Sequence, residues 1–306
     1  MSWSQAEEKI ILLRELLENC SKEEAIQIKK EIDLLKKDAY SSLDAWDIVC
    51  LARHQKRLKA MDLVESLFTD LFEQKGDRYF GEDGALWGGL GSFLGKPVTI
   101  LAQRKGKTLQ ENMECNFGMM NPEGYRKALR LAKQAEKFNR PIITIVDTSG
   151  AYPGKGAEER GQAEAIAQCL KQFMTLNVPV ITIVLSEGGS GGALALSVSD
   201  HIMMLENAIY SILSPEGFAS ILWKDETRVK EAATIMELTS KDLYKKGIVD
   251  QVIKEPLGGI QENPNYCIEQ IRQGLYEQLN KLQSQSGKVR SKVRYEKFRK
   301  LGACHE

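Results

Sequence analysis

Two apolar stretches each end in a glycine-rich turn: PIITIVDTSGAYPG at residues 141–154 and VITIVLSEGGSGG at residues 180–192. The β-branched run that opens each stretch predicts a buried parallel strand, and the residues that follow, 158–176 and 193–198, predict helices. A turn between a strand and a helix collects unpaired backbone N–H groups at the positive end of the helix dipole. Glycine also removes the Cβ atoms that would keep a substrate oxygen away. The two turns therefore predict an anion-binding site.

Composition limits the class of protein. The chain has 306 residues, of which 42% are hydrophobic, enough to build a large core. Lys plus Arg and Asp plus Glu both number 42, so net charge gives no argument for a nucleic-acid or membrane-surface partner. Six cysteines without a Cys-x-x-Cys pair, and an N-terminus without a signal-peptide pattern, favour a reducing cytoplasm. The longest apolar stretches are far shorter than the roughly 20 residues of a membrane helix.

The order of predicted elements divides the chain into an arm, a body and a tail. Capping-box patterns at Ser4 and Ser21, each before helically spaced apolar residues, predict a helical hairpin over residues 1–40. In the body, 41–284, strands and helices alternate, which predicts parallel βαβ units and an α/β layered fold. Residues 285–306 form a basic tail. Besides the elements above, we expect helices over 44–55, 61–75, 122–138, 218–223 and 264–282, and strands over 85–90, 98–101, 201–205 and 209–213.

A serine hydrolase is one hypothesis for the second turn. Residues 188–192 satisfy Gly-x-Ser-x-Gly between a strand and a helix, with Ser190 as the nucleophile. That elbow requires an acid and then a histidine further along the chain, and only His201 and His305 follow. The motif has the right context, but the spacing of the triad argues against it.

Two further hypotheses use backbone N–H groups. The segment 106–108, Gly-Lys-Thr, ends like a phosphate loop, but the leading glycine would fall at Leu101. An enzyme that stabilises an oxyanion with backbone N–H groups needs only what both glycine turns provide. The spacing favours this last hypothesis.

Several stretches, in order along nearly the whole chain, carry a resemblance to a known family. They are residues 51–54, 76–78, 116–119, 122–131, 147–154, 156–162, 187–195, 214–217 and 255–259. The chain resembles the alpha subunits of bacterial-type acetyl-CoA carboxylase carboxyltransferase, members of the crotonase-like superfamily. The resemblance implies a crotonase-like ββα-type layered fold with an N-terminal helical arm.

The resemblance also implies a chemistry. Such proteins form half of a site in which carboxybiotin, carried on a partner protein, gives its carboxyl group to acetyl-CoA, yielding malonyl-CoA for fatty acid synthesis. Gly191 and Gly192 match the family's N–H donors to the biotin ureido oxygen, which gains negative charge as the carboxyl group leaves. We infer that Gly150 and Ala151 close the same pocket from the other turn. This would explain why glycines stand where catalytic side chains would be expected.

Four residues are candidates for contact with biotin: Gly188, Gly189, Ser190 and Tyr152. For the two glycines, close packing of helix on sheet is an equally good explanation, and Ser190 can be a simple turn former.

Half a site requires partners. The resemblance implies a beta subunit, in an alpha2beta2 assembly, that carries the second oxyanion hole and a zinc ribbon. It also implies a biotin carboxyl carrier protein and the biotin carboxylase of an ATP-dependent complex, with acetyl-CoA and malonyl-CoA as substrate and product. A non-catalytic crotonase-like scaffold is the alternative, because half a site cannot turn over alone.

Some side chains keep two interpretations. Arg290, Arg294 and Arg299 of the tail either contact CoA phosphates or a partner, or lie on a solvated helix end. His201 fits a hydrogen-bonded core residue better than a catalytic base. Gln103 stands where the family commonly has histidine, and Ser149 where it commonly has proline. The turn at Ser149 keeps its glycine, so we expect no donor to be lost.

Overall fold

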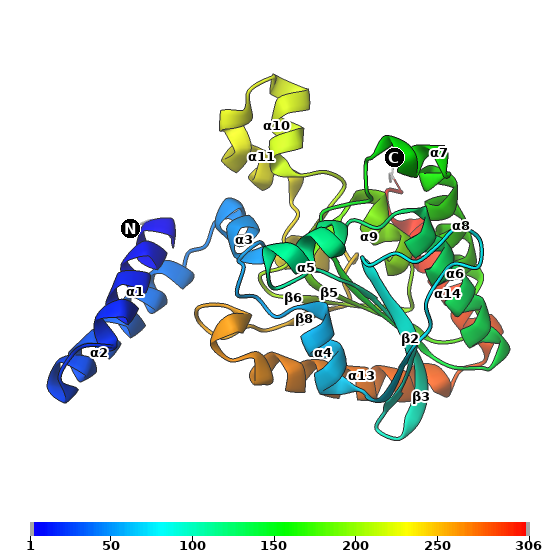
Figure 1. The fold of residues 1–306 in the computed structure, drawn as a ribbon, viewed down its shortest axis with the longest axis horizontal. Coiled ribbons are helices and arrows are strands. Elements are labelled where there is room, and N and C mark those ends of the chain that lie inside the picture. The colour runs from blue at the N-terminus through cyan, green and yellow to red at the C-terminus, as the bar shows by residue number, and fades with distance from the viewer. Residues whose placement is uncertain (1–2, 304–306) are drawn as a thin grey trace.

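The computed structural model describes residues 3–303, within which the strands form one eight-stranded mixed sheet (Figure 1). The strands are β1 (Thr69–Glu73), β2 (Leu86–Phe93), β3 (Lys96–Gln103), β4 (Ile142–Thr148), β5 (Val180–Gly189), β6 (His201–Leu205), β7 (Ile209–Ser211) and β8 (Gln251–Ile253). Their order is β1-β2-β3-β4-β5-β6-β8, with β7 paired to β5. The pairs β1–β2 and β2–β3 are antiparallel, and every pair from β3 onward is parallel. The predicted parallel βαβ units are confirmed.

Helices cover the sheet and form the arm. They are α1 (Trp3–Leu17), α2 (Lys22–Tyr40), α3 (Ala45–Ala52), α4 (Ala60–Leu67), α5 (Leu109–Glu114), α6 (Pro122–Lys137), α7 (Lys155–Glu159), α8 (Gln162–Thr175), α9 (Ser190–Ser197), α10 (Pro215–Trp223), α11 (Val229–Met236), α12 (Ser240–Lys245), α13 (Pro264–Gln283) and α14 (Gly287–Lys300). Helix α6 packs on β2 and β3, and α13 packs on β5 and β8. Among the described residues, no helix is both long and apolar enough to cross a membrane.

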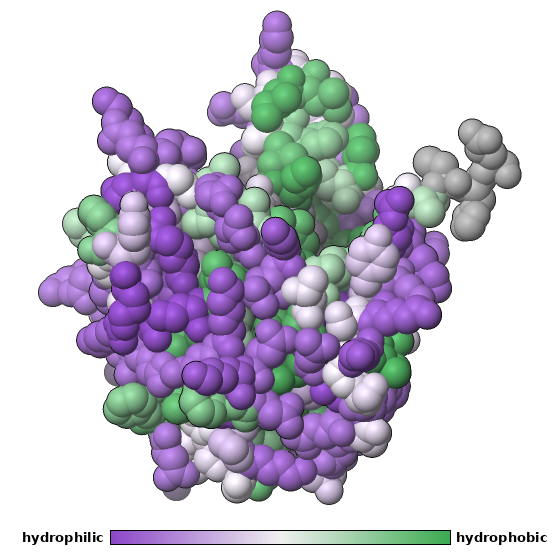
Figure 2. All heavy atoms as spheres, turned by 90° about the vertical axis from the view of Figure 1, so that its right-hand side faces the viewer, coloured by the Kyte–Doolittle hydropathy of each residue, from purple (hydrophilic) through white to green (hydrophobic). Residues whose placement is uncertain are grey.

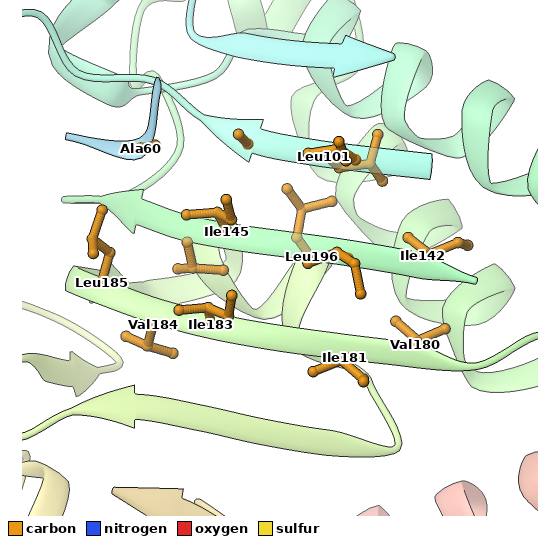
Figure 3. Packing of buried hydrophobic residues seen from close by; sticks show 14 of the residues in the cluster. Ala60, Leu101, Ile142, Ile145, Val180, Ile181, Ile183, Val184, Leu185 and Leu196 are labelled. Atoms are coloured by element: carbon orange, nitrogen blue, oxygen red, sulfur yellow. The ribbon is translucent and has the colours of Figure 1, made fainter. Parts of the chain in front are cut away.

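The core lies around β4 and β5, whose residues are buried at every position. A strand in the centre of a parallel sheet has both faces covered, which is why these two are continuous apolar runs rather than alternating ones. Figure 3 shows Ile145 of β4 and Ile183 of β5 in this layer, with Leu196 of α9 beside them. Because α9 packs against both strands, the start of α9 is held at their carboxyl ends.

The arm is the predicted helical hairpin and extends away from the body (Figure 1). Ser21 and Glu24 form the expected capping box of α2, whereas Ser4 lies inside α1 and caps nothing at that position. The arm has its own small apolar cluster of Ile10, Leu13 and Ile32. Glu262 ends a short 3-10 helix, η3 (Ile260–Glu262), just before α13. It binds Arg14 at 2.5 Å and Lys36 at 2.6 Å, so two ion pairs connect the arm to the body.

Two predicted helices are wrong in extent. The segment 61–75 is not one helix, because α4 ends at Leu67 and residues 69–73 pair with β2 as an edge strand. The segment 158–176 is also divided: Gly161, at φ +82°, breaks it into α7 and α8. Pairing with a neighbouring strand overrides local helical propensity in the first case. A left-handed glycine ends the helix in the second.

The basic segment after residue 284 is a packed helix, α14, rather than a free tail. Arg294 is fully buried and binds Asp200, with Nη2–Oδ2 at 2.7 Å, and the carbonyl of Phe173. Arg290 donates to the carbonyl oxygens of Leu282 and Asn177. These two arginines are therefore not available to CoA phosphates, while Arg299 is exposed.

Candidate active site

The two glycine turns meet in direct backbone contact. Strands β4 and β5 are parallel neighbours, so both turns lie at the same edge of the sheet. A Cβ on Gly189 would lie 2.0 Å from the carbonyl oxygen of Ser149, and one on Gly192 would lie 2.6 Å from the nitrogen of Ala151. Side chains at these two positions would force the turns apart. The two stretches therefore lie side by side in the fold, and their use as one ligand pocket stays a prediction.

Unpaired backbone N–H groups stand on both turns near their contact. The N–H groups in the first turn of α9, including those of Gly191 and Gly192, have no acceptor within the helix, and Gly189 supplies no side-chain cap. Within residues 3–303, nothing accepts a hydrogen bond from the N–H of Ala151. The N–H of Gly150, in contrast, donates to Thr148 Oγ1 at 3.1 Å. Gly150 therefore shapes the turn, at φ +153°, while its own N–H is engaged.

The four predicted biotin contacts lie on the same two turns and differ in exposure. A Cβ on Gly188 would lie 2.3 Å from the ring of Tyr210, so packing alone explains glycine at 188, as contact with Ser149 does at 189. Ser190 is exposed and has φ +53°, a backbone conformation that costs energy for a residue with a side chain. Tyr152 is half-buried beside Gly154. Contact of these four residues with biotin stays a prediction.

A charged network supports the ends of both strands. Lys105 Nζ lies 2.6 Å from Glu187 and 3.0 Å from Asp147, and Arg53 Nε lies 2.8 Å from the same Glu187. Burial disfavours charge on Lys105, but Asp147 and Glu187 outweigh it and raise the pKa of the lysine. Burial would raise the pKa of Glu187, but Lys105 and Arg53 lower it. Lys105 and Glu187 therefore each favour the charged form of the other at the ends of β4 and β5.

Sequence reasoning did not find this network, since its members lie far apart in the chain. The available signal was the acidic residue at each strand end, Asp147 in β4 and Glu187 in β5. Parallel strands bring such residues together, and two neighbouring carboxylates require cations.

The hydrolase hypothesis has no triad within residues 3–303. His201 opens β6 opposite Ile181, at the amino edge of the sheet, whereas Ser190 follows the carboxyl end of β5. The His201 ring hydrogen-bonds Gln251 Oε1 at 3.2 Å, as expected for a core histidine. His54 Nδ1 accepts the N–H of Lys56. His305 lies outside the described residues.

An apolar surface covers helices α10 and α11, which project from the carboxyl edge of the sheet. Figure 2 shows hydrophobic side chains gathered over these helices at the top of that view. The exposed apolar side chains of this surface are Ile221 and Leu222 of α10, Ile235 of α11, and Ile212 just before α10. Ile221 is 77% exposed and Ile212 is 75% exposed. Glu216 of α10 binds Arg53 at 2.6 Å, and Arg53 also binds Glu187, so this surface is linked to the charged network of the site.

The sequence matches the family described as acetyl co-enzyme A carboxylase carboxyltransferase-like over residues 3–302. The chain belongs to this family. It is 48% identical over 299 residues to the acetyl-coenzyme A carboxylase carboxyl transferase subunit alpha of Staphylococcus haemolyticus, covering 95% of each chain. It is also 53% identical over 262 residues to a "subunits beta/alpha" protein of Clostridium tetani, covering 86% of this chain and 46% of that one.

Solved structures of this family's wider fold class resemble the chain in three dimensions. The transcarboxylase 12S structure has a TM-score of 0.59 at 21% identity, covering 73% of this chain and 42% of that one. A Pseudomonas malonate decarboxylase hetero-tetramer in complex with coenzyme A also has a TM-score of 0.59, at 16% identity, covering 74% of this chain and 87% of that one. At these identities the likeness shows the fold alone, and it confirms the predicted crotonase-like layered architecture.

Proposed function

We propose that this chain is the alpha subunit of an acetyl-CoA carboxylase carboxyltransferase and forms the half of the site that receives carboxybiotin. The observation that carries the proposal is the unpaired N–H of Ala151, held against the first turn of α9. Donors from two elements thus lie next to each other, which fits a single ligand oxygen that gains negative charge.

The residues fit a biotin ureido group by their chemistry. Carboxybiotin supplies the carboxyl group to be transferred, and its ureido oxygen becomes more negative as that group leaves. The N–H groups of Ala151, Gly191 and Gly192 are our candidate donors to that oxygen. Backbone contact fixes them before the reaction, and the helix dipole adds positive potential. Loss of one such donor costs roughly 3–4 kcal/mol of transition-state stabilisation in other enzymes.

Gly150 is not among the proposed donors, because its N–H already binds Thr148. We assign it the turn itself, since its φ of +153° suits glycine. The proposed side-chain contacts of the bicyclic biotin ring are Ser190, which is exposed at the start of α9, and Tyr152, which is half-buried.

We further propose that a beta subunit completes the site. The fused beta/alpha protein of Clostridium tetani supports a physical partnership between the two chains. The apolar surface of α10 and α11 is our candidate docking face, because it is exposed and is linked through Arg53 to the site. We propose that the beta subunit carries the zinc ribbon and the second oxyanion hole and assembles with this chain as alpha2beta2. The biotin carboxyl carrier protein and the biotin carboxylase are further proposed partners. We also propose a cytoplasmic location, which the unpaired described cysteines support.

The test is reconstitution. The purified chain, alone and mixed with its beta subunit, is given malonyl-CoA and a biotin derivative, and carboxyl transfer is measured. We expect transfer only from the mixture. Turnover by the chain alone would refute the half-site, and an inactive mixture would refute the carboxyltransferase assignment.

A further inference from the structure

Two buried glutamine side chains hold the two turns from behind. Gln103 ends β3, is fully buried, and donates from Nε2 to the carbonyl oxygen of Gly192 at 2.8 Å. Gln162 begins α8, is 3% exposed, and donates from Nε2 to the carbonyl oxygens of Tyr152 and Met120, each at 2.9 Å. The amide of Gln103 thus hydrogen-bonds the first turn of α9, and that of Gln162 hydrogen-bonds Tyr152, the residue directly after Ala151.

Met120 joins the two amides into one unit. Its sulfur lies 3.5 Å from Gln103 Nε2, and its carbonyl oxygen accepts from both Gln162 Nε2 and the N–H of Tyr152. Both glutamines therefore contact the same buried residue, and each holds one of the donor turns.

Each amide leaves its oxygen without a partner. Within residues 3–303, Oε1 of Gln103 and Oε1 of Gln162 are buried and accept no hydrogen bond from the protein. The hydroxyl of Tyr125 is likewise buried without a hydrogen-bond partner among these residues. It lies 3.0 Å from the point that a Cβ on Gly192 would occupy. Burial raises the pKa of the Tyr125 phenol, which keeps this hydroxyl protonated between the turns.

Unpaired buried polar atoms lower stability, and a methionine of similar length would avoid that cost. Amides at these two positions are therefore better explained by what their N–H groups hold than by the stability of the fold. None of the three side chains supplies a donor that the proposed oxyanion site requires.

We propose that Gln103 and Gln162 are positioning residues that set the distance between the N–H donors of Ala151 and of the first turn of α9. The inference rests on the proposed carboxyltransferase function. An error of a fraction of an ångström in that distance weakens the hydrogen bonds to an oxygen shared by both turns.

The experiment uses the complex with the beta subunit, carrying Gln103→Met, Gln162→Met or both, with Gln168→Met on the exposed face of α8 as the matched control. We measure the melting temperature of each variant together with kcat and KM for malonyl-CoA. In each single variant the loss of an unpaired amide oxygen offsets the loss of a donor to a backbone carbonyl, so the melting temperature should stay within about 2 °C of wild type. We expect kcat to fall by about tenfold to a hundredfold, with KM unchanged. The double variant should lose little more than the worse single one, because both side chains act on one distance.

Two results would overturn the inference. One is a wild-type kcat in both single variants. The other is a melting temperature that falls by several degrees together with kcat, as for residues that only support the fold. An inactive wild-type complex would instead count against the proposed function, so the two failures are distinguishable.

Discussion

The nitrogen of Ala151 lies 2.6 Å from the point that a Cβ on Gly192 would occupy. This contact joins the end of β4 to the start of α9, and it leaves room for glycine only. It also brings the unpaired N–H of Ala151 to the positive end of a helix, where a ligand anion is favoured.

Gly192→Ala should separate the turns, because the new methyl group cannot share space with the backbone of residues 150 and 151. We expect kcat of the reconstituted complex to fall by about a hundredfold. Gly81→Ala is the control, since no atom lies within 4 Å of its added Cβ. Equal activity of the two variants would show that the contact between the turns is irrelevant to catalysis.

Ile221→Asp should weaken assembly with the beta subunit, because it places a charge on the exposed apolar surface of α10 and α11. We expect at least a tenfold increase in Kd, about 1.4 kcal/mol, measured by titration calorimetry. Leu34→Asp on the arm, where the side chain is 68% exposed, serves as the comparison. If only the Leu34 variant loses affinity, the docking face lies on the arm.

Arg294→Met should destabilise the fold by about 3–5 kcal/mol, since it leaves Asp200 buried without its cation. Three backbone carbonyls, of Phe173, Leu176 and Val178, also lose a donor. Urea unfolding measures the effect. The exposed Arg299→Met should change the free energy of unfolding by no more than about 0.5 kcal/mol. Similar values for both variants would contradict the packed position of α14.

Asp77 predicts a specific dependence of stability on pH. Burial alone would raise its pKa, but hydrogen bonds from Arg126 and from the N–H groups of Tyr79, Phe80 and Gly81 lower it from 3.8 to about 2. A lowered pKa stabilises the fold above the unfolded value. That contribution, about 2 kcal/mol, is lost progressively as pH falls from about 5 through 2.

Asp77→Asn keeps an acceptor but removes the charge, so it tests this directly. The difference in the free energy of unfolding between wild type and variant should shrink as pH falls through that range, measured by urea unfolding at each pH. A difference that stays constant from pH 5 to pH 2 would mean that the carboxylate charge contributes nothing.

Local patterns in the sequence predicted much of the fold correctly. The runs at 141 and 180 are strands, and the turn around residues 94–97 joins β2 to β3. Ser21 caps α2 with Glu24 as expected. These features depend on neighbouring residues, which a linear pattern records. The strand at 69–73 was not predicted, because its hydrogen bonds come from β2. The helix predicted to start at residue 193 begins at Ser190 instead.

The sequence by itself determined that two strand-to-helix turns rich in glycine exist, and that they can offer N–H groups to an anion. Only the tertiary structure decided which N–H groups are free. The N–H of Gly150 donates to Thr148 Oγ1, whereas the N–H of Ala151 has no acceptor in the described residues. The backbone geometry of this one turn causes the difference. Only the tertiary structure, too, brought Arg53, Lys105 and Glu187 together and placed Gln103 and Gln162 behind the turns. The physical reason is that contacts between distant residues depend on the order and register of the strands, which no local spacing encodes.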